Sequence, residues 1–337
     1  MVDLDALRSW YDDLVRGTPS LGEEGCAEFA DRQLALGAAF GSRPLCRVLR
    51  PELITRSQLR NLQDSCIQVA DAVRGTLART LEDLESPSLD LSPGALDLMK
   101  IDPGFRKLGI TARLDGFASG DGISFVELNA EAPAGIAYHD SLAEIFAELP
   151  PMRELASRVR LRPLRAVGRL LAALLTTWNE WGRGAGKPRI AIVDWRESPT
   201  APEFRLLADC FARAGYPSFV ADPRDLTLSR GRLVAEGKPI DLVYRRVLFG
   251  DCLRRSDEVA ALVGAVRTRA VCMVNPFRAA LLHRKRIFAD LTAGPPSTEA
   301  DRSLRRLVPW TRMVADTRTE GPDGQRVDLL SWVRAQR

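Results

Sequence analysis

The chain has 337 residues, of which 45% are hydrophobic and 27% charged, a composition typical of a globular protein large enough for two domains. The net charge is only +4 and the arginines are spread along the chain, which argues against nucleic acid as a partner. No segment approaches the roughly 18 consecutive apolar residues of a membrane span. The six cysteines lack CxxC spacing and there are only two histidines, so we expect reduced thiols, no zinc site, no membrane partner and a cytoplasmic location.

The first third of the chain is predicted to be helical. Apolar residues recur there at spacings of three and four: Leu4, Leu7, Tyr11 and Leu14. A long helix is predicted to begin at Pro51, because proline suits the first turn of a helix. Two strands follow, "ITARLDGF" and "GISFVELNAE", joined by "ASGDG", which has the composition of a hairpin turn. Helices are then expected from about His139 to Trp181.

The second half alternates strands and helices. It follows "GRGAGKP" (182–188), which we interpret as a linker. The strands "RIAIVDW" and "PSFVAD" flank the helix "APEFRLLADCFARAGY", a βαβ unit that predicts a parallel sheet. The strands "DLVYRR" and "VCMVN" extend this pattern, and "FRAALLHRKRIFADL" is predicted to be one helix. The predicted fold class is therefore a mixture of α/β and α+β, with an antiparallel hairpin sheet and a separate Rossmann-like parallel sheet.

The predicted hairpin carries a set of oxygen ligands. Asp115 precedes Glu127 by 12 residues, and Asn129 follows Glu127 by two, so the last two share one face of a strand. Carboxylate and amide oxygens suit Mg²⁺ rather than zinc. Arg113 shares a face with Asp115 and is suited to binding a phosphate or a carboxylate. From spacing alone, a solvated hairpin with acidic side chains in water explains the same pattern equally well.

The stretch "RLDGF…FVELNAEAPAG" resembles the metal-binding hairpin of the circularly permuted ATP-grasp enzymes, the glutathionylspermidine synthase-like group. The matching positions are Arg113, Asp115, Glu127, Asn129, Glu131 and Pro133. The resemblance implies that ATP and Mg²⁺ are the cofactors. It implies that Asp115, Glu127 and Asn129 hold the metal against the nucleotide phosphates. It also implies that Arg113 is a catalytic residue that faces the transferring phosphoryl group.

Other residues are candidates for nucleotide or substrate contacts. Lys285 aligns with a lysine that reaches the nucleotide in this group, although a charged helical face is the alternative. Arg245 and Arg246 lie at the carboxyl end of a predicted parallel strand, where open α/β sheets bind ligands. Alternation lets only one of these two arginines point into the crevice, and a solvated strand end is the alternative. Glu131 is the third candidate for substrate contact.

The resemblance covers residues of roughly 95–315 and implies four regions. These are a helical N-terminal region (1–92), an ATP-grasp half with the metal hairpin (93–182), a Rossmann-like pre-ATP-grasp domain (187–275), and a helix and tail (276–337). The tail is expected to lead to a missing second ATP-clamping lobe, because no lysine-proline strand or glycine-rich loop follows Lys285. We therefore expect this chain alone to bind ATP weakly and not to turn it over.

The implied activity is ATP-dependent ligation of a small-molecule carboxylate to an amine through an acyl phosphate. The alternative is a non-catalytic protein of the same fold that binds a nucleotide, a peptide or a partner chain. The sequence leaves the identity of both substrates and the oligomeric state open.

Overall fold

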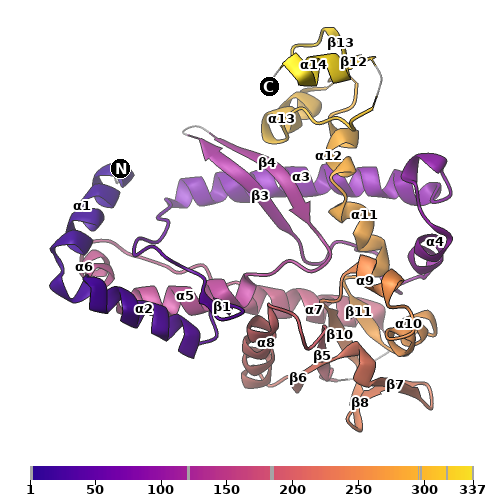
Figure 1. The fold of residues 1–337 in the computed structure, drawn as a ribbon, viewed down its shortest axis with the longest axis horizontal. Coiled ribbons are helices and arrows are strands. Elements are labelled where there is room, and N and C mark those ends of the chain that lie inside the picture. The colour runs from indigo at the N-terminus through magenta and orange to yellow at the C-terminus, as the bar shows by residue number, and fades with distance from the viewer. Residues whose placement is uncertain are drawn as a thin grey trace. The chain divides into compact units, whose positions relative to one another are not determined.

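The computed structural model describes residues 3–119, 122–182, 186–294, 296, 298–315 and 318–335 (Figure 1). The chain folds into two compact units, each built from discontinuous segments. Unit 1 comprises Met1–Thr55, Ile101–Thr111 and Ala132–Pro276, and unit 2 comprises Arg56–Lys100, Ala112–Glu131 and Phe277–Arg337. Within the described residues the strands form five separate sheets among many helices, so the predicted mixed fold class is confirmed. The four predicted domain ranges stay a prediction.

Unit 1 contains a four-stranded parallel sheet in the order β11-β10-β5-β6. Its strands are β5 (Ile190–Val193), β6 (Ser218–Ala221), β10 (Leu242–Arg245) and β11 (Cys272–Val274). Every residue of β5, β10 and β11 is buried, as expected for parallel strands covered on both faces. The predicted pairing of "RIAIVDW" with "PSFVAD" and with "DLVYRR" is confirmed, and the hairpin from Arg113 belongs to a different, antiparallel sheet.

Helices cover this sheet through one apolar core. Leu174 and Phe211 are completely buried and pack with Ile192 of the sheet. The helices of unit 1 are α1 (Leu4–Gly17), α2 (Glu23–Ala35), α5 (Ile136–Glu148), α6 (Pro150–Arg158), α7 (Val167–Trp181), α8 (Ala201–Arg213), α9 (Phe249–Arg254) and α10 (Ala260–Arg267). Its remaining strands are β1 (Ala39–Phe40), β2 (Arg43–Pro44), β7 (Leu226–Ser229), β8 (Arg232–Ala235) and β9 (Lys238–Ile240).

Unit 2 is built around one long helix and the hairpin. The helices are α3 (Arg56–Glu82), α4 (Pro93–Lys100), α11 (Ala280–His283), α12 (Arg286–Leu291), α13 (Glu299–Leu307) and α14 (Leu329–Ala335). The strands are β3 (Arg113–Ser119), β4 (Gly122–Asn129), β12 (Arg318–Glu320) and β13 (Arg326–Asp328). Strand β4 packs against α11 and α13, and α3 packs against α12 and α13, so the hairpin and its helices form one packed body.

Two predicted helices differ from the observed ones. The long helix begins at Arg56 and not at Pro51, because Leu53 of the intervening segment is buried in a cluster with Tyr11 and Leu155. The predicted helix of residues 277–291 is interrupted at Arg284, whose backbone is extended. There the guanidinium of Arg284 donates to the carbonyl oxygen of Leu89 at 2.5 Å, a tertiary contact that local periodicity does not encode.

Two sequence predictions fall partly on residues outside the described ranges. The Gly-rich linker at 182–188 includes residues 183–185, and the hairpin turn at 118–122 includes residues 120 and 121. Among the helices of the described residues, none combines the length and the apolar character needed to cross a membrane.

Candidate functional site

The hairpin register brings the predicted oxygen ligands together. Asp115 of β3 is directly opposite Glu127 of β4, and Arg113 is directly opposite Asn129. Side chains of directly opposed residues lie on the same face of a sheet with Cβ atoms about 4.5–5.5 Å apart. These four side chains therefore form one polar face, which we call the hairpin face.

A bulge between Asp115 and Gly116 keeps the hairpin face polar. The register shifts there, so Gly116 pairs with Phe125 and Val126 is the extra residue. Phe125 and Leu128 are three residues apart, yet both are buried, at 1% and 9% exposure. An extra residue is what allows two side chains with this spacing to face the same core. The apolar side of the hairpin is thus packed, while the residues of the hairpin face are partly exposed to solvent.

Asp115 is fully engaged on the hairpin face. Its Oδ1 accepts a hydrogen bond from Arg113 Nε at 2.7 Å, and its Oδ2 accepts from Arg113 Nη2 at 3.1 Å and from Asn129 Nδ2 at 3.2 Å. With its amide nitrogen turned toward Asp115, Asn129 has its Oδ1 oxygen directed elsewhere. Arg113 is half exposed, so an arriving anion can compete with Asp115 for the guanidinium.

Glu127 is the unpaired member of the hairpin face. Within the described residues its carboxylate makes no hydrogen bond or ion pair, although it is directly opposite another carboxylate. Like charges in this arrangement repel, and a cation between them removes the repulsion. No group of three or more His, Cys, Asp or Glu side chains in the described ranges is arranged to hold a metal. Asp115, Glu127 and Asn129 nevertheless supply the oxygen types that Mg²⁺ prefers, and Asn129 would have to present Oδ1 instead of Nδ2 to act as a ligand. Mg²⁺ takes few protein ligands and completes its shell with phosphate oxygens.

Two further predicted residues belong to the same unit as the hairpin face. Lys285 is exposed at the start of α12, two residues after the end of α11, the helix that packs against β4. Glu131 lies two residues beyond β4 and is buried, with only 6% of its surface exposed. Lys285 is thus exposed and Glu131 is buried, and the roles of both residues stay predictions.

Arg245 is a completely buried arginine at the end of β10. Its Nε donates to the carbonyl of Asn275 at 3.0 Å, its Nη1 to that of Val247 at 2.5 Å and its Nη2 to that of Pro276 at 3.4 Å. Backbone carbonyls therefore surround the guanidinium and tie together the ends of β10 and β11. Arg245 therefore has a structural role in this sheet, and its contact with a substrate stays a prediction.

Arg246 joins a second buried charge, Glu203 of α8. Arg246 Nη2 lies 3.8 Å from Glu203 Oε2, and Arg246 Nη1 donates to the carbonyl of Pro133 at 2.6 Å and to Tyr244 Oη at 3.1 Å. Glu203 Oε1 accepts from the backbone N–H groups of Gly135 at 2.8 Å and Ala137 at 3.1 Å. Gly135 has a φ of 110° and no side chain, so Glu203 supplies the acceptor for the first N–H groups of α5. The buried pair thereby holds the turn that precedes α5.

This buried cluster has unused hydrogen-bonding capacity. Three of its buried polar atoms have no hydrogen-bond partner among the described residues: Tyr138 Oη, Glu203 Oε2 and Arg246 Nε. Burial, with the charge of Glu203 as a smaller contribution, raises the pKa of Tyr138 to about 12, so its hydroxyl keeps its proton at neutral pH. Buried polar atoms are rarely left unpaired, and three of them together fit the polar groups of a ligand or ordered water.

The sequence prediction missed three of the four polar residues that follow the parallel strands. Asp194, Asp222, Arg246 and Asn275 each come directly after a strand of the sheet, and each is at most 8% exposed. The carboxyl edge of a parallel sheet is where ligands bind in this class of fold. The signal was present, because a polar residue directly after a buried apolar run marks this edge.

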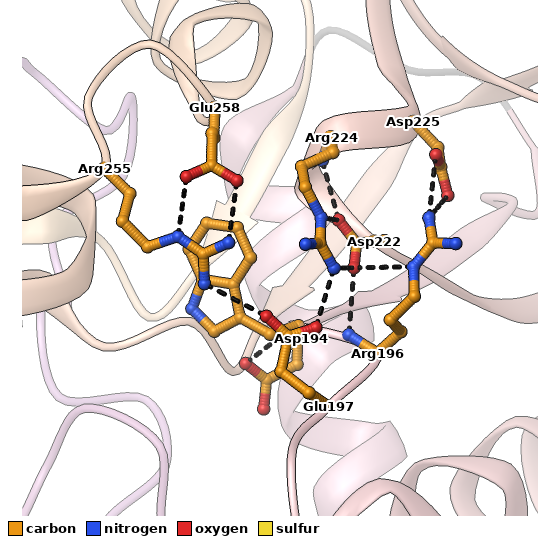
Figure 2. Close-up of polar contacts among 9 residues, drawn as sticks. Asp194, Arg196, Glu197, Asp222, Arg224, Asp225, Arg255 and Glu258 are labelled. Atoms are coloured by element: carbon orange, nitrogen blue, oxygen red, sulfur yellow. Dashed lines mark hydrogen bonds and ion pairs between the residues drawn. The ribbon is translucent and has the colours of Figure 1, made fainter.

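An ion-pair network closes part of the same edge (Figure 2). Arg224 bridges Asp222 and Glu197, with nitrogen–oxygen distances of 2.6 and 2.7 Å. Arg255 continues from Glu197 to Glu258, and its Cζ lies 3.4 Å from the ring centroid of Trp195. In Figure 2, arginine and carboxylate side chains alternate along this network, so each arginine already has acidic partners. We interpret the network as a structural connection between the loops that follow β5 and β6 and the segment between α9 and α10.

Asp222→Asn is expected to lower the free energy of unfolding at pH 7 by roughly 1–3 kcal/mol. Burial alone would raise the pKa of Asp222, but hydrogen bonds from Arg224 and Arg196 outweigh it and hold that pKa well below its usual range. A lowered pKa in the folded state means that the stabilisation is present above the ordinary Asp pKa and is lost as pH falls through the folded value. Urea unfolding at pH 7 and at successively lower pH checks this, because the gap between variant and wild type should narrow. Asp225→Asn, at an exposed ion pair of the same network, is the control and should change stability by less than about 1 kcal/mol.

Comparisons with known proteins give a structural likeness. No family model matches the chain, and no curated protein matches it. Among solved structures, the chain is similar to a glutathione synthetase-like effector (GSS30) from Globodera pallida, determined in its apo form. The TM-score is 0.55 at 14% sequence identity, over 86% of this chain and 68% of that chain. At this identity the likeness shows the fold alone.

Proposed function

We propose that this chain carries the metal and phosphate side of an ATP-dependent carboxylate–amine ligase of the circularly permuted ATP-grasp type, in the glutathionylspermidine synthase-like group. The observation that carries the proposal is the hairpin face, where Asp115 is opposite Glu127 and Arg113 is opposite Asn129. The likeness to a glutathione synthetase-like structure supports it at the level of the fold.

The residues of the hairpin face would have different roles in binding Mg-ATP. Asp115, Glu127 and Asn129 would hold Mg²⁺, which when bound supplies positive charge that offsets the charge of the nucleotide phosphates. Arg113 would stabilise the negative charge on the transferring phosphoryl group, and a guanidinium does so at any physiological pH. Lys285 would contact the nucleotide from the start of α12. Helix α12 follows α11, which packs against β4.

The proposed reaction needs no covalent enzyme nucleophile. An oxygen of the substrate carboxylate attacks the γ-phosphorus of ATP, the bond to the β-phosphate oxygen breaks, and ADP leaves. The amine nitrogen of the second substrate then attacks the carbonyl carbon of the acyl phosphate. Phosphate leaves with the bonding electron pair, and the nitrogen loses a proton to give the amide.

The buried pair of unit 1 supports a substrate role for Arg246 more than for Arg245. Arg246 Nε and Glu203 Oε2 both lack hydrogen-bond partners in the described part of the chain, whereas three backbone carbonyls surround Arg245. Glu131 is the acidic candidate for the amine substrate. The substrates themselves are proposed only as a small carboxylate and a small amine.

A panel of carboxylates and amines with Mg-ATP, assayed with the full-length gene product, tests the proposal. ADP release that requires both a carboxylate and an amine, with an amide product identified by mass spectrometry, is the expected result. Calorimetric titration of Mg-ATP on the same protein reports nucleotide binding separately. ADP release without any amide product would contradict ligation.

A second candidate is a non-catalytic protein with the same fold that binds a nucleotide, a peptide or a partner chain. The observation in its favour is that Arg113 and Asn129 already occupy both oxygens of Asp115, as in a polar surface that needs no cation. Mg-ATP binding without ADP release for every carboxylate and amine tested would favour this candidate.

A further inference from the structure

Unit 1 contains a groove between helix α2 and the segment of residues 39–49, far along the chain from the hairpin face. Its volume is about 610 Å³, within the range of roughly 300–1,000 Å³ that is usual for small-molecule sites. Six of its ten lining residues are apolar, Phe29 and Phe40 among them, and none is acidic. Phe40 is 46% exposed, which is unusual for a large aromatic side chain and leaves apolar surface open to a ligand.

The wall of the groove is held in place without a ligand. Gln33 is completely buried. Its side-chain amide makes two hydrogen bonds to the backbone of Cys46, the pattern that a residue of a paired strand makes. Its Nε2 donates to the Cys46 carbonyl at 2.9 Å, and its Oε1 accepts from the Cys46 N–H at 2.7 Å. Beneath the groove, Phe29 packs edge-to-face on Phe146 with ring centroids 5.3 Å apart. A preformed wall lowers the ordering cost that a ligand has to overcome.

The polar part of the groove is positively charged and unpaired. Arg43 and Arg47 both line it and are exposed, and within the described residues neither makes a side-chain hydrogen bond or an ion pair. Arg32 and Arg50, which lie nearby in sequence and do not line the groove, each have an acidic partner. The groove therefore combines an apolar floor with two guanidinium groups that have no counter-ion among the described residues. This positive charge is complementary to an anion.

We propose that this groove binds a small organic anion with an apolar body. The anionic head, a carboxylate or a phosphate, pairs with Arg43 and Arg47, and the hydrocarbon or aromatic body packs on Phe29 and Phe40. Neither the hairpin face nor the buried pair of Arg246 and Glu203 contributes a residue, so this inference is independent of the proposed ligase activity.

Two cysteines of the groove report on its occupancy. Cys26 and Cys46 line it, whereas Cys210 of α8 does not and serves as the internal reference. The experiment measures the rate of alkylation of each thiol by iodoacetamide in the full chain, resolved by peptide mass spectrometry. Octanoate and octyl phosphate are the anionic probes, and octanamide is the neutral control. Both anions are expected to slow alkylation of the groove thiols and not of Cys210, and the stronger of the two identifies the preferred head group.

Variants of the two arginines decide whether the charge is responsible. The double variant Arg43→Ala/Arg47→Ala is expected to raise the half-protecting concentration of the better anion roughly tenfold or more, because two charge-assisted hydrogen bonds are lost. Arg50→Ala, directly after this segment and outside the groove, should leave the half-protecting concentration within about twofold of the wild-type value. Equal protection by octanamide, an unchanged value in the double variant, or no protection at about 10 mM of either anion would overturn the proposal.

Discussion

In the full-length gene product, Glu127→Gln is expected to abolish ligation, lowering kcat roughly 100-fold or more, with no loss of stability. Glutamine is nearly isosteric with glutamate but lacks the charge that holds a divalent cation. Glu127 has no hydrogen-bond or ion-pair partner within the described residues, so the substitution breaks no contact there. It also removes the repulsion with Asp115 on the opposite strand, so the free energy of unfolding should be unchanged or slightly raised.

Two measurements check this prediction, ADP release at saturating Mg²⁺ and urea unfolding. Glu82→Gln is the matched control, because Glu82 is an exposed glutamate of the same unit at the end of α3. That control should keep both the activity and the stability of the wild type. A kcat for Glu127→Gln comparable to that of the wild type would remove the hairpin face from the proposed metal site. An inactive but unfolded variant is distinguished by its urea transition.

Arg246→Met is expected to lower the free energy of unfolding by roughly 3–5 kcal/mol, the largest stability effect that we predict. Both side chains of the pair with Glu203 are at most 3% exposed. Removing the arginine leaves a buried carboxylate without its counter-charge and deprives the Pro133 carbonyl of its donor. Breaking one partner of a buried pair costs more than the pair itself contributes, because the remaining charge stays desolvated.

A double-mutant cycle with Glu203→Gln tests this explanation. The double variant should be less destabilised than the sum of the two single variants, because the amide needs no counter-charge. Arg254→Met is the control, since Arg254 is 71% exposed and its pair with Asp251 should contribute less than about 1 kcal/mol. Additive effects in the cycle, or a change below about 1 kcal/mol for Arg246→Met, would show that the pair is not coupled as described.

Local sequence pattern predicted the elements that are defined by one apolar face. The βαβ pattern of "RIAIVDW", "APEFRLLADCFARAGY" and "PSFVAD" predicted parallel pairing, and β5 does pair with β6 in parallel. The spacing of Asp115, Glu127 and Asn129 predicted a shared face, and the register places Asp115 opposite Glu127. Alternation along a strand is a property of neighbouring residues, so a single sequence records it.

Helix boundaries were predicted less well from the sequence, because they depend on contacts with residues far away in the chain. The helix predicted from Pro51 begins only at Arg56, since Leu53 is drawn into a cluster with Tyr11 and Leu155. The break at Arg284 coincides with a hydrogen bond to Leu89, 195 residues earlier in the chain. No local propensity contains such a contact, and tertiary packing overrides propensity where the two compete.

By itself, the sequence determined the fold class, the two kinds of sheet and the oxygen-rich character of the hairpin. Only the tertiary structure decided which charges are buried. Arg245 and Arg246 are adjacent and chemically identical, yet one is surrounded by carbonyls and the other pairs with Glu203 and reaches Pro133, 113 residues away. The physical reason is that burial of a charge is tolerated only where distant segments bring complementary groups to it, and a one-dimensional pattern does not contain that arrangement.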